Sequence, residues 1–259
     1  DTMKFRLVGG SGLRSSTVVL GGMTFGDKRS WGASEEESQA ILRAYVERGG
    51  TTIDTAPNYA HGASEEIIGR FAKDRRDDLV LSVKYTASNS SHPLAGGNSR
   101  RSMIQSVEGS LARLNTDRID LLWLHFWDFT TPLDEILRAA DDLVRAGKVL
   151  YFGLSDTPAW IASRAATMAE MARWTPVAAL QVEYNVGSRS VENDLLPLAS
   201  ACDMGVFCWG PLAAGALAGG EDPQRRRPET VPPELVAIAV QLADLGKKTG
   251  RSARHLALQ

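Results

Sequence analysis

Short apolar runs alternate with amphipathic segments along most of the chain, and this alternation constrains the fold more than any other feature. Several of the runs are almost continuously apolar, which is typical of parallel strands covered on both faces. We expect strands at residues 16–22, 51–55, 79–84, 119–125, 149–155, 178–184 and 205–209. Apolar residues at helical spacing predict helices at 34–48, 99–114, 132–146 and 233–249. This order predicts a parallel α/β fold.

The spacing of the expected strands favours one parallel fold over another. The carboxyl ends of six of them fall at residues 54, 84, 125, 155, 181 and 209. Most intervals between successive ends are close to the roughly 31 residues per unit of a (β/α)8 TIM barrel. A doubly wound sheet would carry a glycine-rich phosphate loop after an early strand. The nearest match, GGSGLRSS at 9–16, opens no apolar helix and is interpreted as a hairpin turn. We therefore expect residues 1–259 to form a single (β/α)8 barrel domain.

The C-terminal end does not complete such a barrel. The sequence stops at SARHLALQ, within a segment that we interpret as helical, after seven expected strands. An eighth strand and helix are needed to close the barrel. We expect that both are missing from this sequence and that the domain is C-terminally incomplete.

Composition argues against several classes of partner. The formal net charge of −2 gives no overall field for nucleic acid or an acidic membrane, and no apolar run approaches the roughly 20 residues that cross a bilayer. The N-terminus lacks the apolar core of a signal peptide, and two cysteines suit the reducing cytoplasm. The basic run 225–227 is interpreted as a solvated loop. Four scattered histidines and the absence of paired-cysteine spacing predict no metal.

Four polar residues stand where a barrel carries its chemistry. Asp54, Lys84 and His125 end successive expected strands, and Tyr59 lies in the loop after the first of them. A nearby Lys84 would favour the phenolate of Tyr59 and lower its pKa, while Asp54 orients Lys84. His125 would donate a hydrogen bond to a substrate oxygen. Taken singly, each residue also fits a structural role: a turn, a surface aromatic, a snorkelling lysine or a structural histidine.

Together these residues suit the reduction of a carbonyl to an alcohol, for which a cofactor must supply hydride. They resemble the aldo-keto reductase superfamily, and the resemblance covers most of the chain. It is carried by LGGMTFG (20–26), TTIDTAPNYAHGASEEIIG (51–69), LVLSVKY (79–85), the segment 96–125, GKVLYFGLSD (147–156), LQVEYN (180–185) and CWGPLAAGALAGG (208–220). The style of GGNSRRSM is similar to that of the bacterial, potassium-channel-β-like branch.

The resemblance implies a (β/α)8 barrel that binds NADPH, or less often NADH, without a Rossmann domain. It implies a catalytic tetrad of Asp54, Tyr59, Lys84 and His125, with Tyr59 as the general acid. The implied cofactor contacts are Gly22, Met23, Asp54, Ser155, Asp156, Gln181, Trp209, Pro211, Leu212 and Gly215. Two residues depart from the family pattern: Asp156 stands where an Asn is usual, and Gly210 where a Ser is common. The preference for NADPH rests on the family alone. The adenosine site of the family lies in and after strand eight, which we expect to be missing from this sequence.

Aromatic residues near the expected barrel mouth predict a wall for a flat or bulky substrate, such as a polyketide, a steroid-like ring or a deoxysugar intermediate. They are Trp31, Tyr85, Phe126, Trp127 and Phe129. Ordinary loop packing explains them equally well. The partner is expected to be a small-molecule carbonyl, and a homo-oligomer stays open. The alternative function is a cofactor-binding regulatory subunit resembling potassium-channel β-subunits, and the oxidative direction is also open.

Overall fold

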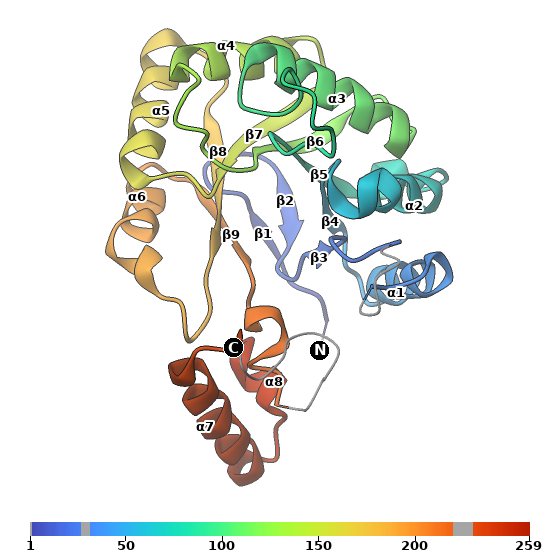
Figure 1. Ribbon diagram of the computed structural model, residues 1–259, viewed down its shortest axis with the longest axis vertical. Helices are drawn as coiled ribbons and strands as arrows, with labels where there is room; N and C mark the ends of the chain where they lie inside the picture. The colour runs from blue at the N-terminus through green and yellow to red at the C-terminus, as the bar shows by residue number, and fades with distance from the viewer. Residues whose placement is uncertain (1, 27–31, 220–229) are drawn as a thin grey trace. The chain divides into compact units, whose positions relative to one another are not determined.

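The computed structural model describes residues 2–26, 32–219 and 230–259 (Figure 1). The chain divides into two compact units. The first comprises Asp1–Leu180 and Leu198–Val206, and the second comprises Gln181–Pro197 and Phe207–Gln259. All four residues of the predicted tetrad belong to the first unit. That the whole chain forms a single domain stays a prediction.

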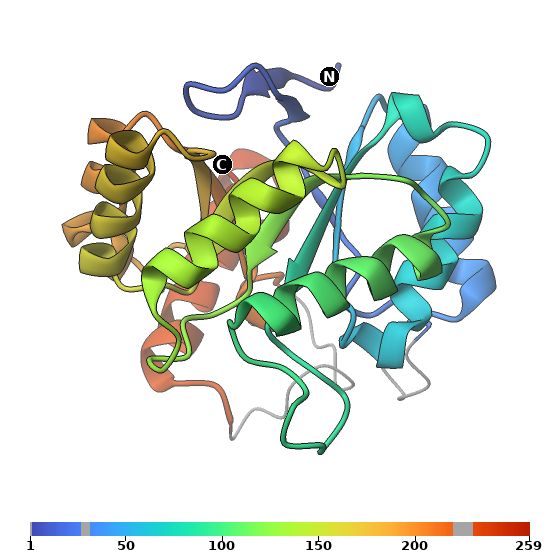
Figure 2. The ribbon, with the colours of Figure 1, turned by 90° about the horizontal axis from the view of Figure 1, so that it is seen from above.

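The described residues contain a seven-stranded sheet whose strands follow the order of the sequence. Its members are β3 (Leu20–Gly21), β4 (Thr52–Thr55), β5 (Val80–Tyr85), β6 (Ile119–Leu124), β7 (Val149–Ser155), β8 (Val177–Glu183) and β9 (Gly205–Trp209). Strands β3 to β7 pair in parallel, and helices cover their outer side (Figure 2). The fold is therefore α/β and of the TIM-barrel type, as the sequence predicts.

An antiparallel hairpin precedes the sheet. Strand β1 (Phe5–Leu7) pairs with β2 (Arg14–Ser16), which confirms that GGSGLRSS is a turn and not a phosphate loop. Gly9 is required in this turn because its φ is +55° and an added Cβ would lie 2.2 Å from the carbonyl oxygen of Asp203. The expected strand at 16–22 was too long, since only Leu20–Gly21 joins the sheet.

Eight α-helices lie in the described part of the chain. They are α1 (Glu35–Glu47), α2 (Ala63–Ala72), α3 (Arg100–Leu114), α4 (Leu133–Arg145), α5 (Ala159–Ala172), α6 (Leu195–Ala201), α7 (Pro233–Thr249) and α8 (Ala253–Ala257). The four predicted helices are α1, α3, α4 and α7. At the start of α1 the Glu37 amide donates to Ser34 Oγ at 3.2 Å and the Ser34 amide donates to Glu37 Oε2 at 2.8 Å. This reciprocal capping explains why the helix begins there.

Four short 3₁₀ segments complete the described elements: η1 (Tyr59–Gly62), η2 (Arg76–Asp78), η3 (Ser190–Asn193) and η4 (Ala213–Gly215). In the second unit, η4 and the two last helices share a small apolar core. It consists of Ala213, Leu217 and Ala257, with Leu212, Ala216, Leu235, Ile238, Ala239 and Leu242 packed against it. These contacts hold the η4 turn in place.

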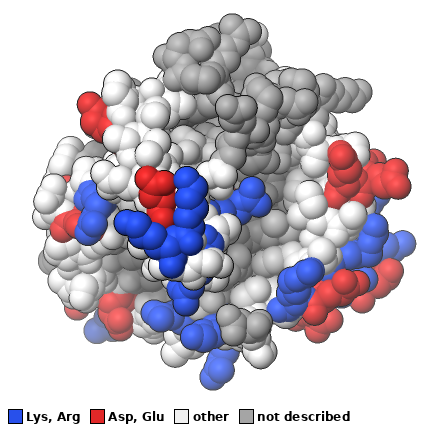
Figure 3. Space-filling model, turned by 90° about the horizontal axis from the view of Figure 1, so that it is seen from below, with Lys and Arg blue, Asp and Glu red and all other residues white. Residues whose placement is uncertain are grey.

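The surface charge is mixed on the face drawn in Figure 3, where basic side chains lie beside acidic ones. This arrangement agrees with the formal net charge of −2. Among the described residues, no helix is long and apolar enough to span a membrane. Within the same residues, no group of three or more His, Cys, Asp or Glu side chains is placed to hold a metal ion.

Candidate active site

Strand register brings the predicted acid and lysine together. Asp54 of β4 lies opposite Ser82 of β5, and Lys84 of β5 lies opposite Trp123 of β6. Side chains two residues apart on a strand point to the same face, so Ser82 and Lys84 both face the side on which Asp54 lies. Lys84 Nζ forms an ion pair with Asp54 Oδ1. The two residues are only 3% and 9% exposed, so this pair is buried.

Tyr59 and His125 lie beside this ion pair. Lys84 Nζ is 5.2 Å from the centre of the Tyr59 ring, and the Tyr59 and His125 rings meet edge to face at 6.1 Å. The chain turns sharply just after the tyrosine, because Ala60 and His61 both have positive φ, at 47° and 57°. Such strained backbone is concentrated at functional sites. The four side chains of the predicted tetrad therefore lie together in the structure.

The electrostatics of the tetrad differ in part from the expectation. Burial raises the pKa of Tyr59, and this outweighs the charge of Lys84, which lowers it. The predicted net lowering of the Tyr59 pKa was therefore wrong for this structure, although Lys84 acts in the predicted direction. Burial alone would lower the pKa of Lys84, but Asp54 and Tyr59 raise it overall, so Lys84 is charged.

His125 is neutral at physiological pH. Burial, followed by the charge of Lys84, lowers its pKa to about 4. Its Nδ1 is buried and has no hydrogen-bond partner among the described residues. A neutral imidazole carries one N–H donor, so His125 retains the capacity to donate a hydrogen bond to an uncharged oxygen.

A carboxylate fixes the loop that follows His125. Asp128 Oδ2 accepts from the Asn98 amide at 2.9 Å and from Thr131 Oγ1 at 2.7 Å, while its Oδ1 accepts from the amides of Thr130 and Thr131 at 2.9 Å. Burial would raise the pKa of Asp128, but these donors lower it to about 2. Asn98 Nδ2 also donates to the Phe126 carbonyl at 3.1 Å. The loops after β5 and β6 are thus held together.

The predicted aromatic wall is reproduced only in part. Phe126 and Phe129 are 42% and 73% exposed, and the Trp127 ring contacts Phe129 edge to face at 6.5 Å. Tyr85, in contrast, is fully buried. It follows Lys84 on the same strand and so faces the opposite side of the sheet, which leaves it no exposed surface for a substrate in this structure. Trp31 lies outside the described residues.

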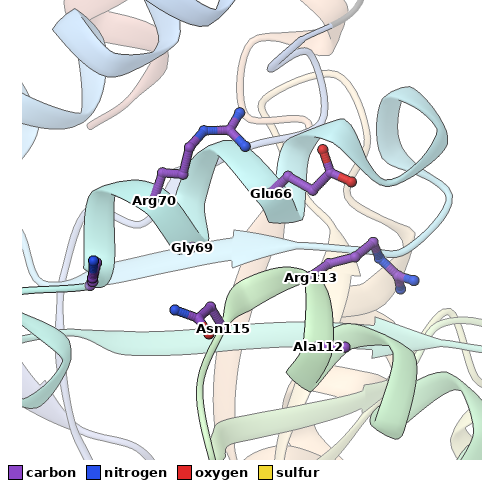
Figure 4. A pocket seen from close by; sticks show the side chains of 7 residues that line it. Glu66, Gly69, Arg70, Ala112, Arg113 and Asn115 are labelled. Atoms are coloured by element: carbon purple, nitrogen blue, oxygen red, sulfur yellow. The ribbon is translucent and has the colours of Figure 1, made fainter.

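A separate pocket lies between α2 and α3. It has a volume of about 490 Å³ and is lined by Glu66, Gly69, Arg70, Lys73, Ala112, Arg113 and Asn115 (Figure 4). Except for Glu66, which lies in the first turn of α2, these residues lie in or just after the last turns of the two helices, and each helix leads back to the amino end of the next strand. The tetrad, in contrast, lies at or beyond the carboxyl ends of its strands. The pocket is therefore not part of the candidate active site.

The comparison with known families agrees with this geometry. A family model described as the aldo/keto reductase family matches residues 17–259. The chain belongs to the aldo/keto reductase family. The tetrad predicted from the strand ends is thus found together in the fold of a family whose members the sequence resembles.

Several curated relatives of this aldo/keto reductase are fungal. An aryl-alcohol dehydrogenase [NADP(+)] from Phanerodontia chrysosporium is 38% identical over 236 residues, which is 85% of this chain and 61% of the relative. A norsolorinic acid reductase from Aspergillus flavus is 39% identical over 82% of this chain and 58% of the relative. An aryl-alcohol dehydrogenase from Pestalotiopsis microspora is 33% identical over 86% of this chain and 61% of the relative. These relatives do not point specifically to the bacterial, potassium-channel-β-like branch.

The chain spans about three fifths of the length of these relatives. Within it, the cofactor residues predicted for an aldo/keto reductase fall in both units. In the first unit, the Gly22 amide donates to the Asp54 carbonyl at 2.8 Å and the Gly22 carbonyl accepts from Ser64 Oγ at 2.7 Å. Met23 is 52% exposed and Ser155 is buried. Gly22 is thus bonded within the protein, and the Met23 side chain is the more accessible of the pair.

Asp156, where the family usually has Asn, is exposed and has a φ of +39°. Asn and Asp are the residues that tolerate this left-handed region best after glycine. The backbone therefore explains why a short polar side chain stands here. The Asp156 carbonyl accepts from the Trp127 amide at 3.3 Å, which joins the loop after β7 to the loop after β6.

The remaining predicted cofactor residues belong to the second unit. Gln181 is buried on β8, and Trp209, the last residue of β9, is 40% exposed. The turn after β9 contains positive φ at Gly210, Ala213, Ala214 and Gly215. The Leu212 side chain packs into the apolar core of this unit. An exposed ring followed by a tightly turned backbone fits the nicotinamide and phosphate contacts that the resemblance implies for Trp209, Pro211, Leu212 and Gly215.

Two residues of the first unit escaped the sequence reasoning. Ser82 Oγ donates to Asp54 Oδ2 at 2.7 Å, and Trp123 Nε1 donates to Ser82 Oγ at 2.5 Å. A signal was present, because each stands two residues before a tetrad member, Lys84 or His125, inside an otherwise apolar run. Strand alternation puts them on the same face as those members, but only coordinates show the hydrogen bonds.

Proposed function

We propose that this aldo/keto reductase interconverts an aromatic carbonyl compound and the corresponding alcohol, using NADP(H), with Tyr59 as the proton donor. The observation that carries the proposal is the placement of Tyr59 and His125 beside the buried Lys84–Asp54 ion pair. A phenol beside a fixed ammonium is a general acid whose conjugate base is stabilised as it forms. Because the chain spans only part of its relatives, the activity is inferred from the site and not transferred from them.

The proposed roles follow from the state of each residue. The raised pKa of Tyr59 keeps its phenol protonated at neutral pH, and the phenol gives this proton to the carbonyl oxygen. Lys84, which is charged, stabilises the phenolate that remains, and Asp54 holds Lys84 in position. Neutral His125 donates a hydrogen bond to the same substrate oxygen. When bound, the nicotinamide cofactor supplies hydride to the carbonyl carbon, so the C=O π bond is replaced by a C–H and an O–H bond.

The preference for NADP(H) is proposed on the name of one relative, an aryl-alcohol dehydrogenase [NADP(+)]. NADH is the alternative that the sequence leaves open. A measurement of kcat/KM with each reduced cofactor separates them: the proposal expects NADPH to be favoured at least about tenfold, a difference of roughly 1.4 kcal/mol. Equal values for the two cofactors would contradict this part of the proposal.

The proposed aromatic substrate has two supports. Phe126, Trp127 and Phe129 lie within the four residues after His125, and Phe126 and Phe129 are exposed. The names of two relatives refer to aryl alcohols. Aromatic rings contact one another favourably in offset or edge-to-face geometry, so an aryl group suits this surface.

The cytoplasmic location is also proposed, because Cys202 and Cys208 are free thiols.

The proposal is tested by following the absorbance of NADPH with an aromatic aldehyde and with an aliphatic aldehyde of equal carbon number. We expect the aromatic aldehyde to be reduced with the higher kcat/KM. Phe126→Leu should reduce the ratio of the two kcat/KM values, aromatic over aliphatic, by about fivefold, since one ring contact is lost. If NADPH binds and no carbonyl is reduced, the protein is instead a cofactor-binding regulatory subunit, as the sequence also allowed.

A further inference from the structure

The Asp54 carboxylate is held from two sides by buried groups. One oxygen, Oδ1, pairs with Lys84, and the other, Oδ2, accepts from Ser82 Oγ at 2.7 Å. Ser82 Oγ in turn accepts from Trp123 Nε1 at 2.5 Å. Ser82 and Trp123 are both fully buried. A chain of hydrogen bonds therefore leads from the indole of β6, through the hydroxyl of β5, to the carboxylate of β4.

The sheet register builds this chain. Asp54 lies opposite Ser82, Lys84 opposite Trp123, and Trp123 opposite Gly153 of β7. Gly153 makes room for the indole, because an added Cβ there would lie 2.4 Å from the Trp123 ring. A ring so closely bounded is fixed in one orientation. Its N–H is consequently aimed at the Ser82 hydroxyl by packing.

The chain has a direction that follows from the chemistry of its members. An indole N–H only donates, and an ionised carboxylate only accepts, whereas a hydroxyl does both. Because Ser82 Oγ accepts the N–H of Trp123, its own proton is directed to Asp54 Oδ2. Trp123 therefore acts on Asp54 through the Ser82 hydroxyl.

We propose that Ser82 and Trp123 are positioning residues of the active site, which orient Asp54 so that its other oxygen holds Lys84 beside Tyr59. The role of this orientation in catalysis rests on the function proposed above. The hydrogen-bond chain and its influence on Tyr59 are properties of the protein alone, and these are measurable without turnover.

The loss of the Ser82 hydroxyl should disfavour ionisation of Tyr59. The charged groups that act on Tyr59 are Lys84, which lowers its pKa, and Asp54 and Asp156, which raise it; His125 is neutral. Without the Ser82 donor, Asp54 presents a less compensated charge to the phenol, and Lys84 is held less firmly. Both effects act in the same direction, toward a higher pKa of Tyr59.

The test compares the ionisation of Tyr59 in the wild type with that in Ser82→Ala, Ser82→Thr, Ser38→Ala and Trp123→Phe. Carbon-13 labelling of the ring carbon that bears the hydroxyl reports phenol and phenolate by NMR, and the Tyr59→Phe variant identifies the Tyr59 signal among the five tyrosines. At one fixed alkaline pH, we expect the phenolate-to-phenol ratio of Tyr59 to fall at least about threefold in Ser82→Ala. Ser82→Thr, which keeps the hydroxyl, should restore the wild-type ratio.

Ser38→Ala is the matched control, because Ser38 is also fully buried but donates to the carbonyl of Ser34, the N-cap residue of α1, at 2.6 Å. It should lose stability without changing the ratio. Trp123→Phe should lower the ratio in the same direction as Ser82→Ala, and less than additively with it, because both act through one chain. If Trp123→Phe does not fold, Ser82→Ala alone decides.

An unchanged ratio in Ser82→Ala, or an equal fall in Ser38→Ala, would overturn the inference. In the assay with an aromatic aldehyde, Ser82→Ala should lower kcat about tenfold or more with KM nearly unchanged. A rise in KM with kcat unchanged would equally contradict a positioning role. If the wild type reduces no carbonyl, the proposed function fails, while the NMR comparison still decides whether Ser82 acts on Tyr59.

Discussion

Lys84 shows how one residue depends on its surroundings. Its ammonium is almost fully buried, and an isolated charge there would be costly. The structure compensates with the Asp54 carboxylate, whose second oxygen is satisfied by Ser82. Partners of this kind are what make a buried ion pair tolerable. The sequence could place both charges at strand ends, but not show that the pair is buried.

Removal of one partner of this pair should be far more damaging than the loss of an exposed pair. We expect Lys84→Met to lower the free energy of unfolding by about 3–5 kcal/mol, because it leaves the Asp54 carboxylate buried and uncompensated. Lys148→Met removes the exposed pair with Glu108 and should change stability by less than about 1 kcal/mol. Urea unfolding measures both. Similar losses in the two variants would show that the Asp54 charge is well solvated.

His125 predicts a specific dependence of stability on pH. Its folded-state pKa of about 4 lies below the ordinary value of 6.5, so the unfolded chain takes up the proton first as pH falls. The contribution of neutral His125 to the free energy of unfolding is therefore fully present above about pH 6.5 and is lost as pH falls toward 4. This contribution is roughly 1–3 kcal/mol after allowance for partial exposure.

Urea unfolding at about pH 7 and about pH 5 tests this linkage. His125→Gln should remove most of the decrease seen in wild type over that interval, since glutamine does not titrate. His92→Gln is the control, because His92 is exposed. An unaltered decrease in His125→Gln would mean that another group is responsible for it.

At the scale of elements, α2 packs closely against the end of α3 because residue 69 is a glycine and has no side chain. Gly69 of α2 backs onto the end of α3, where an added Cβ would lie 2.6 Å from the Leu114 carbonyl oxygen. Backbone atoms cannot move aside as a flexible side chain can. Gly109 of α3 offers a contrast, because its added Cβ would meet only the far end of Arg113, at 3.1 Å.

These two helical glycines predict opposite outcomes. Gly109→Ala should stabilise the protein by up to about 1 kcal/mol, through helix propensity. Gly69→Ala should destabilise it by about 1–3 kcal/mol, because the overpacking at Leu114 exceeds the same gain. The change in unfolding free energy of each variant is the measurement. Stabilisation by Gly69→Ala would contradict the close approach of Gly69 to the backbone of Leu114.

Elements were predictable where their pattern was strong. Strands β4 to β9 follow apolar runs that the sequence displays directly, and α1 carries a capping box. Helix α5 was missed because its alanine-rich sequence, AWIASRAATMAEMA, spreads small apolar residues around the helix and leaves a weak stripe. The contacts of Asp128 with Asn98 could not be foreseen, since they join loops whose conformations depend on one another.

At the scale of the whole chain, the sequence predicted the family fold and the meeting of the four tetrad residues, because parallel strands present their carboxyl ends at one edge. It did not predict the balance of burial against charge at Tyr59, which depends on how deeply the phenol lies. Tyr85 was predicted to belong to the aromatic wall, although strand alternation already places its side chain on the face of the sheet opposite to that of Lys84. The expectation of a C-terminally incomplete barrel stays a prediction, and a homo-oligomer stays open.

The central claim is that Tyr59 gives a proton to the carbonyl oxygen, and Tyr59→Phe tests it most directly. The variant removes the hydroxyl and keeps the ring, so NADPH binding should be nearly unchanged by fluorescence titration. The kcat for an aromatic aldehyde should fall by about 100-fold or more, the usual contribution of a general acid. A kcat within about threefold of wild type, with NADPH bound normally, would contradict the account.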